Sequence, residues 1–276
     1  MGTSSSSPGP KRPPNLLPPW GGDPIPPNPP PPDQDNEPLG NATPTLPPQT
    51  QKPTPWSVPK GAMTRFAHGG GSLGSVGRSY VSANGGASHL ATSARSGRQT
   101  AGSLAGFMAN GIRSGFAEAA RQIGLGNLVG RDVEFVLASF VDLIAPSGAT
   151  VEQAIARDAL NDTLWEVFDR YGVNTEGIGA LDKLGRNELT EVIGLYISNY
   201  VNERLQQELF YRVERGTMNE TEANNCATQI KDFVFEVVRL DFQDIDPVTF
   251  DWQGTDGKNL IEQKYQEAYS LLGDAE

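Results

Sequence analysis

The most constraining feature of this sequence is the distribution of proline: 20 of the 22 prolines lie in residues 1–59. Proline fixes φ and removes a backbone hydrogen-bond donor, which prevents regular helices and sheets. The same stretch has few apolar residues to offset the entropy of ordering the chain. We therefore predict a disordered Pro-rich N-terminal tail over residues 1–60, with local polyproline II at residues 26–32. The globular part is expected to lie nearer the C-terminus.

Residues 61–130 are rich in Gly, Ala and Ser, and 16 of them are glycine. Glycine destabilises a helix by roughly 1 kcal/mol relative to alanine. We therefore expect a flexible loop at residues 61–77 and only weak helices at residues 78–95 and 98–122. This part of the chain is predicted to be a basic linker, either tightly packed or partly disordered.

Residues 131–276 show the apolar periodicity of amphipathic helices. One helix is predicted over residues 131–145, and a capping box of Thr150 with Gln153 predicts a second helix that ends at Gly172. Further helices are predicted near 175–184, from Asn187 to about 215, from Asn219 to about 240, and from about 258 to 272. No strand pattern is visible, so we predict an all-α fold, with a C-terminal helical bundle of about five or six helices.

The charge changes sign along the chain. Residues 1–130 carry 10 Lys+Arg and 5 Asp+Glu (net +5), and residues 131–276 carry 12 and 28 (net −16), which together give −11. Phosphate binding requires clustered cations, so we expect no direct nucleic-acid contact by the acidic helical domain. A moderate basic stripe is either a solvated surface, a partner of the acidic half, or a site for phosphate or an acidic partner. It consists of Lys60, Arg65, Arg78, Arg95, Arg98, Arg113 and Arg121.

No arrangement of residues predicts catalysis. The only histidines, His68 and His89, lie in glycine-rich sequence without a serine–histidine–acid pattern. The single cysteine, Cys226, excludes an intrachain disulfide and a zinc ligand set, which suits a reducing compartment. The acidic loop at residues 241–256 lacks the ligand order of an EF-hand, and its aromatic residues are expected to hold it on the bundle. We predict no catalytic residue, no metal, no cofactor and, without an apolar signal segment, a cytoplasmic protein.

The N-terminus is the feature with the clearest chemical potential. Removal of Met1 would expose the α-amine of Gly2, which titrates at roughly pH 8 and is a nucleophile when unprotonated. Thr3, Ser4 and Ser5 are slim enough to enter a deep active site. One interpretation is therefore that the N-terminus is modified, and the sequence formally fits the N-myristoylation pattern. The alternative is that the N-terminus is an unmodified disordered tail. Within the tail, Trp20 is either a docking point for a partner or a solvated side chain.

Several stretches, taken in order, resemble the QatB family of the bacterial Qat anti-phage defence system. No single motif is decisive, but the ordered set is specific and covers nearly the whole chain. The stretches are Met1–Pro10, Leu16–Trp20, Arg95–Gly106, Gly124–Gly130, Gly148–Thr150, Asn199–Leu205, Leu240–Asp241 and Asp251–Trp252.

The resemblance implies three partners: a QueC-like enzyme (QatC), a P-loop ATPase (QatA) and a TatD-like nuclease (QatD). QueC-like enzymes use ATP to activate a carboxylated 7-deazaguanine and couple it to an amine. The resemblance therefore implies that Gly2 is the acceptor of a 7-deazaguanine base, with Thr3, Ser4 and Ser5 as the recognition stem. On this basis we expect a non-catalytic substrate and adaptor subunit. The tail is longer and richer in proline than is expected of the family, so no role beyond spacing is implied for residues 21–59.

A second class of function stays open. Glycines four residues apart, such as Gly102 and Gly106, can drive helix association in lipid. A membrane-acting effector could use the Gly/Ala-rich segment 98–125 in this way. Arg113 and Glu118 make that segment a poor membrane span, so our first expectation is that the protein does not bind a membrane.

Overall fold

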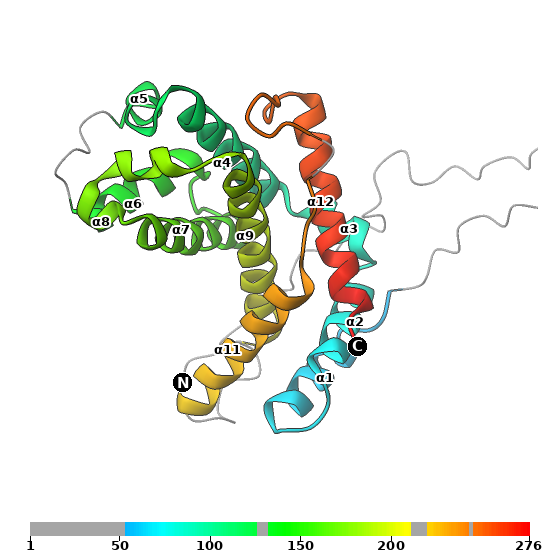
Figure 1. The fold of residues 1–276 in the computed structure, drawn as a ribbon. Coiled ribbons are helices and arrows are strands. Elements are labelled where there is room, and N and C mark those ends of the chain that lie inside the picture. Colours follow the sequence, from blue (N-terminus) through cyan, green and yellow to red (C-terminus); the bar gives the residue numbers. More distant parts are fainter. Residues whose placement is uncertain (1–52, 126–131, 211–219, 243–244) are drawn as a thin grey trace, which may run out of the picture. The chain divides into compact units, whose positions relative to one another are not determined.

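The computed structural model describes residues 53–125, 132–210, 220–242 and 245–276 (Figure 1). The predictions for residues 1–52, which include most of the predicted tail, the Gly2 stem and Trp20, lie outside the described residues. The last residues of the predicted tail, Ser57–Lys60, are helical, because helix α1 begins at Ser57. Every regular element in the described ranges is helical and none is a strand, which confirms the all-α fold. The described residues belong to one compact unit, Thr50–Glu276.

The glycine-rich half is folded into well-formed helices, so the prediction of a flexible loop at residues 61–77 is wrong. Helix α2 begins inside that range, and a Cβ at its Gly74 or Gly77 would lie 2.4 or 2.6 Å from backbone atoms of Glu276 or Leu272. Glycine is needed here because α2 lies directly against the last helix, and this packing offsets the low intrinsic helix propensity. The helices are α1 (Ser57–Ala67), α2 (Leu73–Ala83), α3 (Ala87–Ser93), α4 (Arg95–Ser114) and α5 (Phe116–Gln122).

The acidic half forms the remaining elements, and most of the predicted ends are close to those observed. The capping box at Thr150 is present, and Gly172 ends that helix in the left-handed conformation with φ 72°. The predicted cap at Asn187 is wrong, because the Glu188 carboxylate accepts the Gly185 N–H at 3.0 Å and the helix begins at Arg186. The elements are α6 (Val133–Ile144), α7 (Val151–Tyr171), α8 (Val173–Glu176), the 3-10 turn η1 (Ile178–Lys183), α9 (Arg186–Leu205), the π-helical turn η2 (Gln206–Phe210), α11 (Glu220–Val237) and α12 (Thr255–Asp274).

Both halves contribute to one hydrophobic core. Helix α4 packs against α7, α9 and α12, and α12 also packs against α2 and α3. The apolar face of α4, with Leu104, Phe107 and Met108, is buried in this core. Among the described helices, none has the length and apolar character required to cross a membrane. Gly97, Gly102 and Gly111 of α4 are buried in its packing against neighbouring helices.

The loop between α11 and α12 is held in place by its aromatic residues, as expected. Trp252 is almost fully buried and its Nε1–H donates to the carbonyl of Pro247 at 2.8 Å. Its ring meets those of Phe250 and Phe242 edge to face, with centroids 5.1 and 6.4 Å apart. Asp251 and Trp252 lie against the first turn of α12, where a Cβ at Gly257 would come within 2.5 Å of their backbone atoms.

Candidate functional site

The site residues predicted from the sequence, Gly2, Thr3, Ser4, Ser5 and Trp20, lie outside the described residues. Elsewhere, the two histidines are not near a catalytic partner: the Nδ1–H of exposed His68 donates to the Thr64 carbonyl at 2.7 Å, and His89 is exposed. Burial raises the pKa of the Cys226 thiol, which lowers its thiolate fraction at neutral pH. In the described part of the chain, no three potential metal ligands come together.

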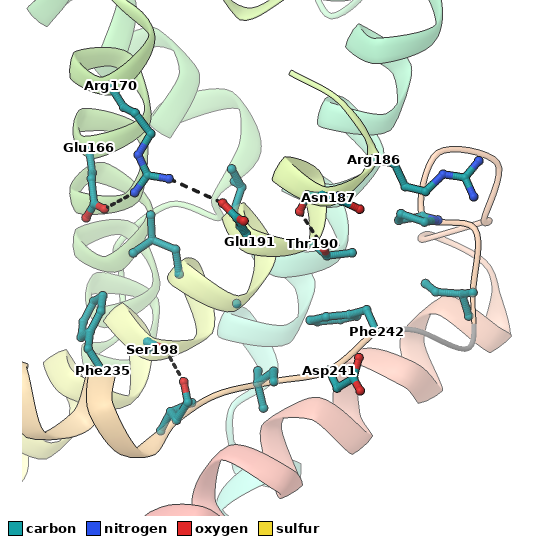
Figure 2. A pocket seen from close by; sticks show the side chains of 17 residues that line it. Glu166, Arg170, Arg186, Asn187, Thr190, Glu191, Ser198, Phe235, Asp241 and Phe242 are labelled. Atoms are coloured by element: carbon teal, nitrogen blue, oxygen red, sulfur yellow. Dashed lines mark hydrogen bonds and ion pairs between the residues drawn. The ribbon is translucent and has the colours of Figure 1, made fainter. Parts of the chain in front are cut away.

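A groove of about 580 Å³ runs along α9, between the end of α7 and residues 238–242 and 245–247 (Figure 2). We call it the α9 groove. Apolar side chains, including Phe235 and Phe242, form part of its lining, as Figure 2 shows. The Ser198 hydroxyl lies within it and donates to the carbonyl of Val238 at 3.5 Å.

Ion pairs form much of the polar lining of the α9 groove. Arg170 contacts Glu166 at 2.8 Å and Glu191 at 3.8 Å, and Arg186 contacts Asp246 at 3.2 Å. Both arginines are therefore engaged by carboxylates. These pairs are exposed, so each contributes at most about 1 kcal/mol to stability. The groove has the mixed polar and apolar character of a contact surface.

A second surface lies on the outward side of α7. Asp158, Asp162, Trp165 and Asp169 follow one another at intervals of three or four residues, which places them on one face of the helix. Trp165 is 48% exposed, although Trp is usually well buried. None of the three aspartates forms an ion pair within the described ranges.

Helix α9 adds a further carboxylate to this surface, that of Glu203. Burial, followed by repulsion from Asp162 and Asp158, raises the pKa of Glu203 to about 7, and Lys231 of α11 opposes the shift. Burial also raises the pKa of Asp162, with repulsion from Asp158 adding to the shift and Lys231 again opposing it. We call the surface of Asp158, Asp162, Trp165, Asp169 and Glu203 the acidic face.

The acidic face is suited to a cationic partner. An added Lys or Arg would relieve the repulsion among the carboxylates, and it would interact favourably with the face of the exposed indole. The residues of the acidic face were not among those singled out from the sequence. The sequence did contain a signal for this surface. Trp165 shares its helix face with three aspartates, whereas a tryptophan that packs in the core shares its face with apolar residues.

Comparison with protein families gives a match over residues 85–272 to the family described as "Qat anti-phage system associated protein QatB". No curated protein and no solved structure matches the chain. The matched residues cover well over half of the chain and include both the α9 groove and the acidic face. The chain therefore belongs to the QatB family of proteins associated with the Qat anti-phage system.

Proposed function

We propose that this chain is a non-catalytic subunit of the Qat defence complex and acts as both substrate and adaptor. Its processed N-terminus would be conjugated to a 7-deazaguanine base by the QueC-like partner, while the helical domain docks that partner. Family membership supports the association with anti-phage defence. The conjugation step and the docking step are separate parts of the proposal, and each has its own test.

The conjugation part concerns the α-amine of Gly2. With a carboxylated 7-deazaguanine activated by ATP, this amine attacks the activated carbonyl carbon and forms an amide. The amine loses a proton, and the activating group leaves. Support comes from the glycine itself, which offers an amine with little steric cover, and from the slim residues Thr3, Ser4 and Ser5 that follow it. Deprotonation near neutral pH is accessible because an α-amine titrates at roughly pH 8.

The docking part rests on one observation, the exposure of Trp165 among carboxylates that form no ion pair with any residue the structure describes. An enzyme that modifies the tail must hold the chain while the tail enters its active site. We assign the acidic face to a Lys/Arg-rich surface of the QueC-like partner. Complementary charge would speed association, and the indole would supply buried contact area.

Mass spectrometry tests the conjugation part. The full chain is expressed with and without the QueC-like gene, and its intact mass and N-terminal peptides are compared. We expect a mass increment on Gly2 that requires the gene, is reduced by Gly2→Val and survives Ser7→Ala. An unmodified Gly2 in both samples would overturn conjugation and leave docking to be judged on its own.

Binding measurements with the purified QueC-like partner test the docking part. Trp165→Ala should weaken binding by about tenfold or more, since an aromatic at the centre of an interface commonly contributes 2 kcal/mol or more. The matched control is Leu143→Ala on α6, because Leu143 is 49% exposed and lies outside the acidic face. Asp158→Asn with Asp169→Asn should reduce the salt dependence of the affinity. Equal losses for Trp165→Ala and Leu143→Ala would contradict this docking site.

A further inference from the structure

A cavity of about 510 Å³ lies between the N-terminal half of α4 and the start of α12. Its lining includes three cations, Arg95, Arg98 and Lys258, and no carboxylate. This is an unusual local composition for a chain with a net charge of −11. Arg95 and Arg98 belong to the basic stripe defined from the sequence. The proposed function gives that stripe no role.

The charges of this cavity are only partly neutralised. One Arg98 nitrogen, Nη1, pairs with Glu262, and Nη2 donates to the Thr92 carbonyl at 3.2 Å. The Nε–H of Arg98 is buried and has no hydrogen-bond partner among the described residues. Arg95 and Lys258 are exposed, and neither forms an ion pair in the part of the chain that the structure describes. A buried donor without a partner is costly, so an acceptor that reached it would be bound favourably.

Small residues of α4 line the cavity where this helix comes close to the backbone of Trp252. A Cβ at Gly102 of α4 would lie 3.3 Å from the carbonyl oxygen of Trp252. The next residue, Ser103, also lines the cavity, as do Gln99 and Gln253. Their side chains carry neutral hydrogen-bond donors. The cavity therefore combines positive charge with several hydrogen-bond donors on elements that are fixed by the core.

We infer that this cavity binds a small molecule that carries phosphate groups, of the size of a nucleoside diphosphate. Arginine suits this ligand because its guanidinium can donate two parallel hydrogen bonds to one phosphate. The volume falls within the range of small-molecule pockets, about 300–1,000 Å³. A long nucleic acid carries the same phosphates, but it would have to lie against an acidic half of net charge −16, which repels it.

Calorimetric titration of the full chain with inorganic pyrophosphate and with ADP tests this inference. We expect saturable binding at one site for each ligand. Arg95→Gln and Lys258→Gln should each weaken binding by about tenfold, the usual effect of removing a charged hydrogen-bonding partner. The control is Arg113→Gln, which removes the same charge from the same helix at an exposed position outside the cavity.

A second variant separates shape from charge. Ser103→Met fills the cavity without altering any charge and should also abolish binding of both ligands, with thermal unfolding confirming that each variant is folded. The inference is overturned if neither ligand binds saturably, or if Arg113→Gln weakens binding as much as Arg95→Gln. Tighter binding of a single-stranded oligonucleotide than of ADP at the same cavity would also overturn it, in favour of a nucleic-acid site.

Discussion

At the scale of single residues, the absence of a side chain decides how closely the helices approach. A Cβ at Gly97 of α4 would lie 2.4 Å from the Tyr200 ring and 2.7 Å from the Tyr265 hydroxyl. Both tyrosines are fully buried, and their rings meet edge to face at 5.2 Å. Neither ring can move aside without disturbing a close-packed interior. Gly97 is thus required by the packing of α4 on α9 and α12.

Gly97→Ala should lower the free energy of unfolding by about 1–3 kcal/mol, because the added methyl overpacks the core. The matched control is Gly194→Ala in α9, where an added Cβ would have nothing within 4 Å. That change should stabilise the protein by up to about 1 kcal/mol through helix propensity. Urea denaturation of both variants measures the difference, and a neutral result for Gly97→Ala would contradict the close packing.

The raised pKa of Glu203 makes stability depend on pH. The pKa is about 7 in the folded protein against an ordinary value of 4.5, so the folded state binds the proton more tightly than the unfolded state. Stability should therefore fall as pH rises from about 4.5 to about 7. Glu203→Gln, which cannot ionise, should lose this part of the dependence. Above pH 7 it should be more stable than the wild type by about 1 kcal/mol, after allowance for solvent screening.

Urea denaturation between pH 4.5 and pH 8 checks this expectation, with Glu236→Gln as the control. Glu236 is an exposed acid on α11, the helix that also carries Lys231. A constant difference between Glu203→Gln and the wild type across this range would refute the role given to Glu203.

At the scale of elements, one carboxylate joins three helices. Glu152 near the start of α7 accepts the backbone N–H groups of Ser96 and Gly97 at 3.1 and 3.0 Å. These are among the N–H groups that the first turn of α4 cannot satisfy within the helix. The Tyr200 hydroxyl of α9 donates to the same carboxylate at 2.8 Å. Glu152 thereby provides for α4 the cap that no side chain at its own N-terminus supplies.

Glu152→Ala should lower the free energy of unfolding by about 2–4 kcal/mol, because it leaves three donors without an acceptor in a largely buried place. Glu166→Ala on the same helix is the comparison. Its ion pair with Arg170 is exposed, so we expect a loss below about 1 kcal/mol. Chemical denaturation distinguishes the two, and similar losses would mean that the α4 cap contributes little.

At the scale of the whole molecule, the compact unit is larger than the family match. The match begins at residue 85, whereas α1 and α2 precede it and belong to the same unit. Val76 and Tyr80 of α2 are fully buried, and α2 packs directly on α12. The helices before residue 85 therefore complete the core of the family region in this protein (Figure 1).

A chain shortened to begin at residue 85 should be less stable than one that begins at residue 50. Each large apolar side chain that loses its burial costs about 1.5–3 kcal/mol, so the difference should exceed about 3 kcal/mol. Limited proteolysis and urea denaturation of the two shortened chains measure it. Equal stability would show that α1 and α2 do not stabilise the rest of the compact unit.

Periodicity within single segments predicted part of the fold. The helix from Thr150 to Gly172 was predicted correctly because its cap, its apolar stripe and its stop are all local signals. The folded state of residues 61–77 was not predicted, because glycine has a low intrinsic helix propensity. The helix that packs on these glycines cannot be identified from the local sequence. The acidic face was not predicted because the exposure of Trp165 depends on which side of α7 packs against the core. That side is set by contacts with other helices.

The sequence by itself determined the helical class, the split of charge and the resemblance to the QatB family. These follow from composition, short-range periodicity and ordered motifs, none of which requires long-range contacts. Only the tertiary structure decided that the glycines of α2 and α4 are contact points, that Glu152 caps a distant helix, and that three cations surround one cavity. Each depends on residues far apart in the chain, such as Arg95 and Lys258, and only the packing of the helices brings them together.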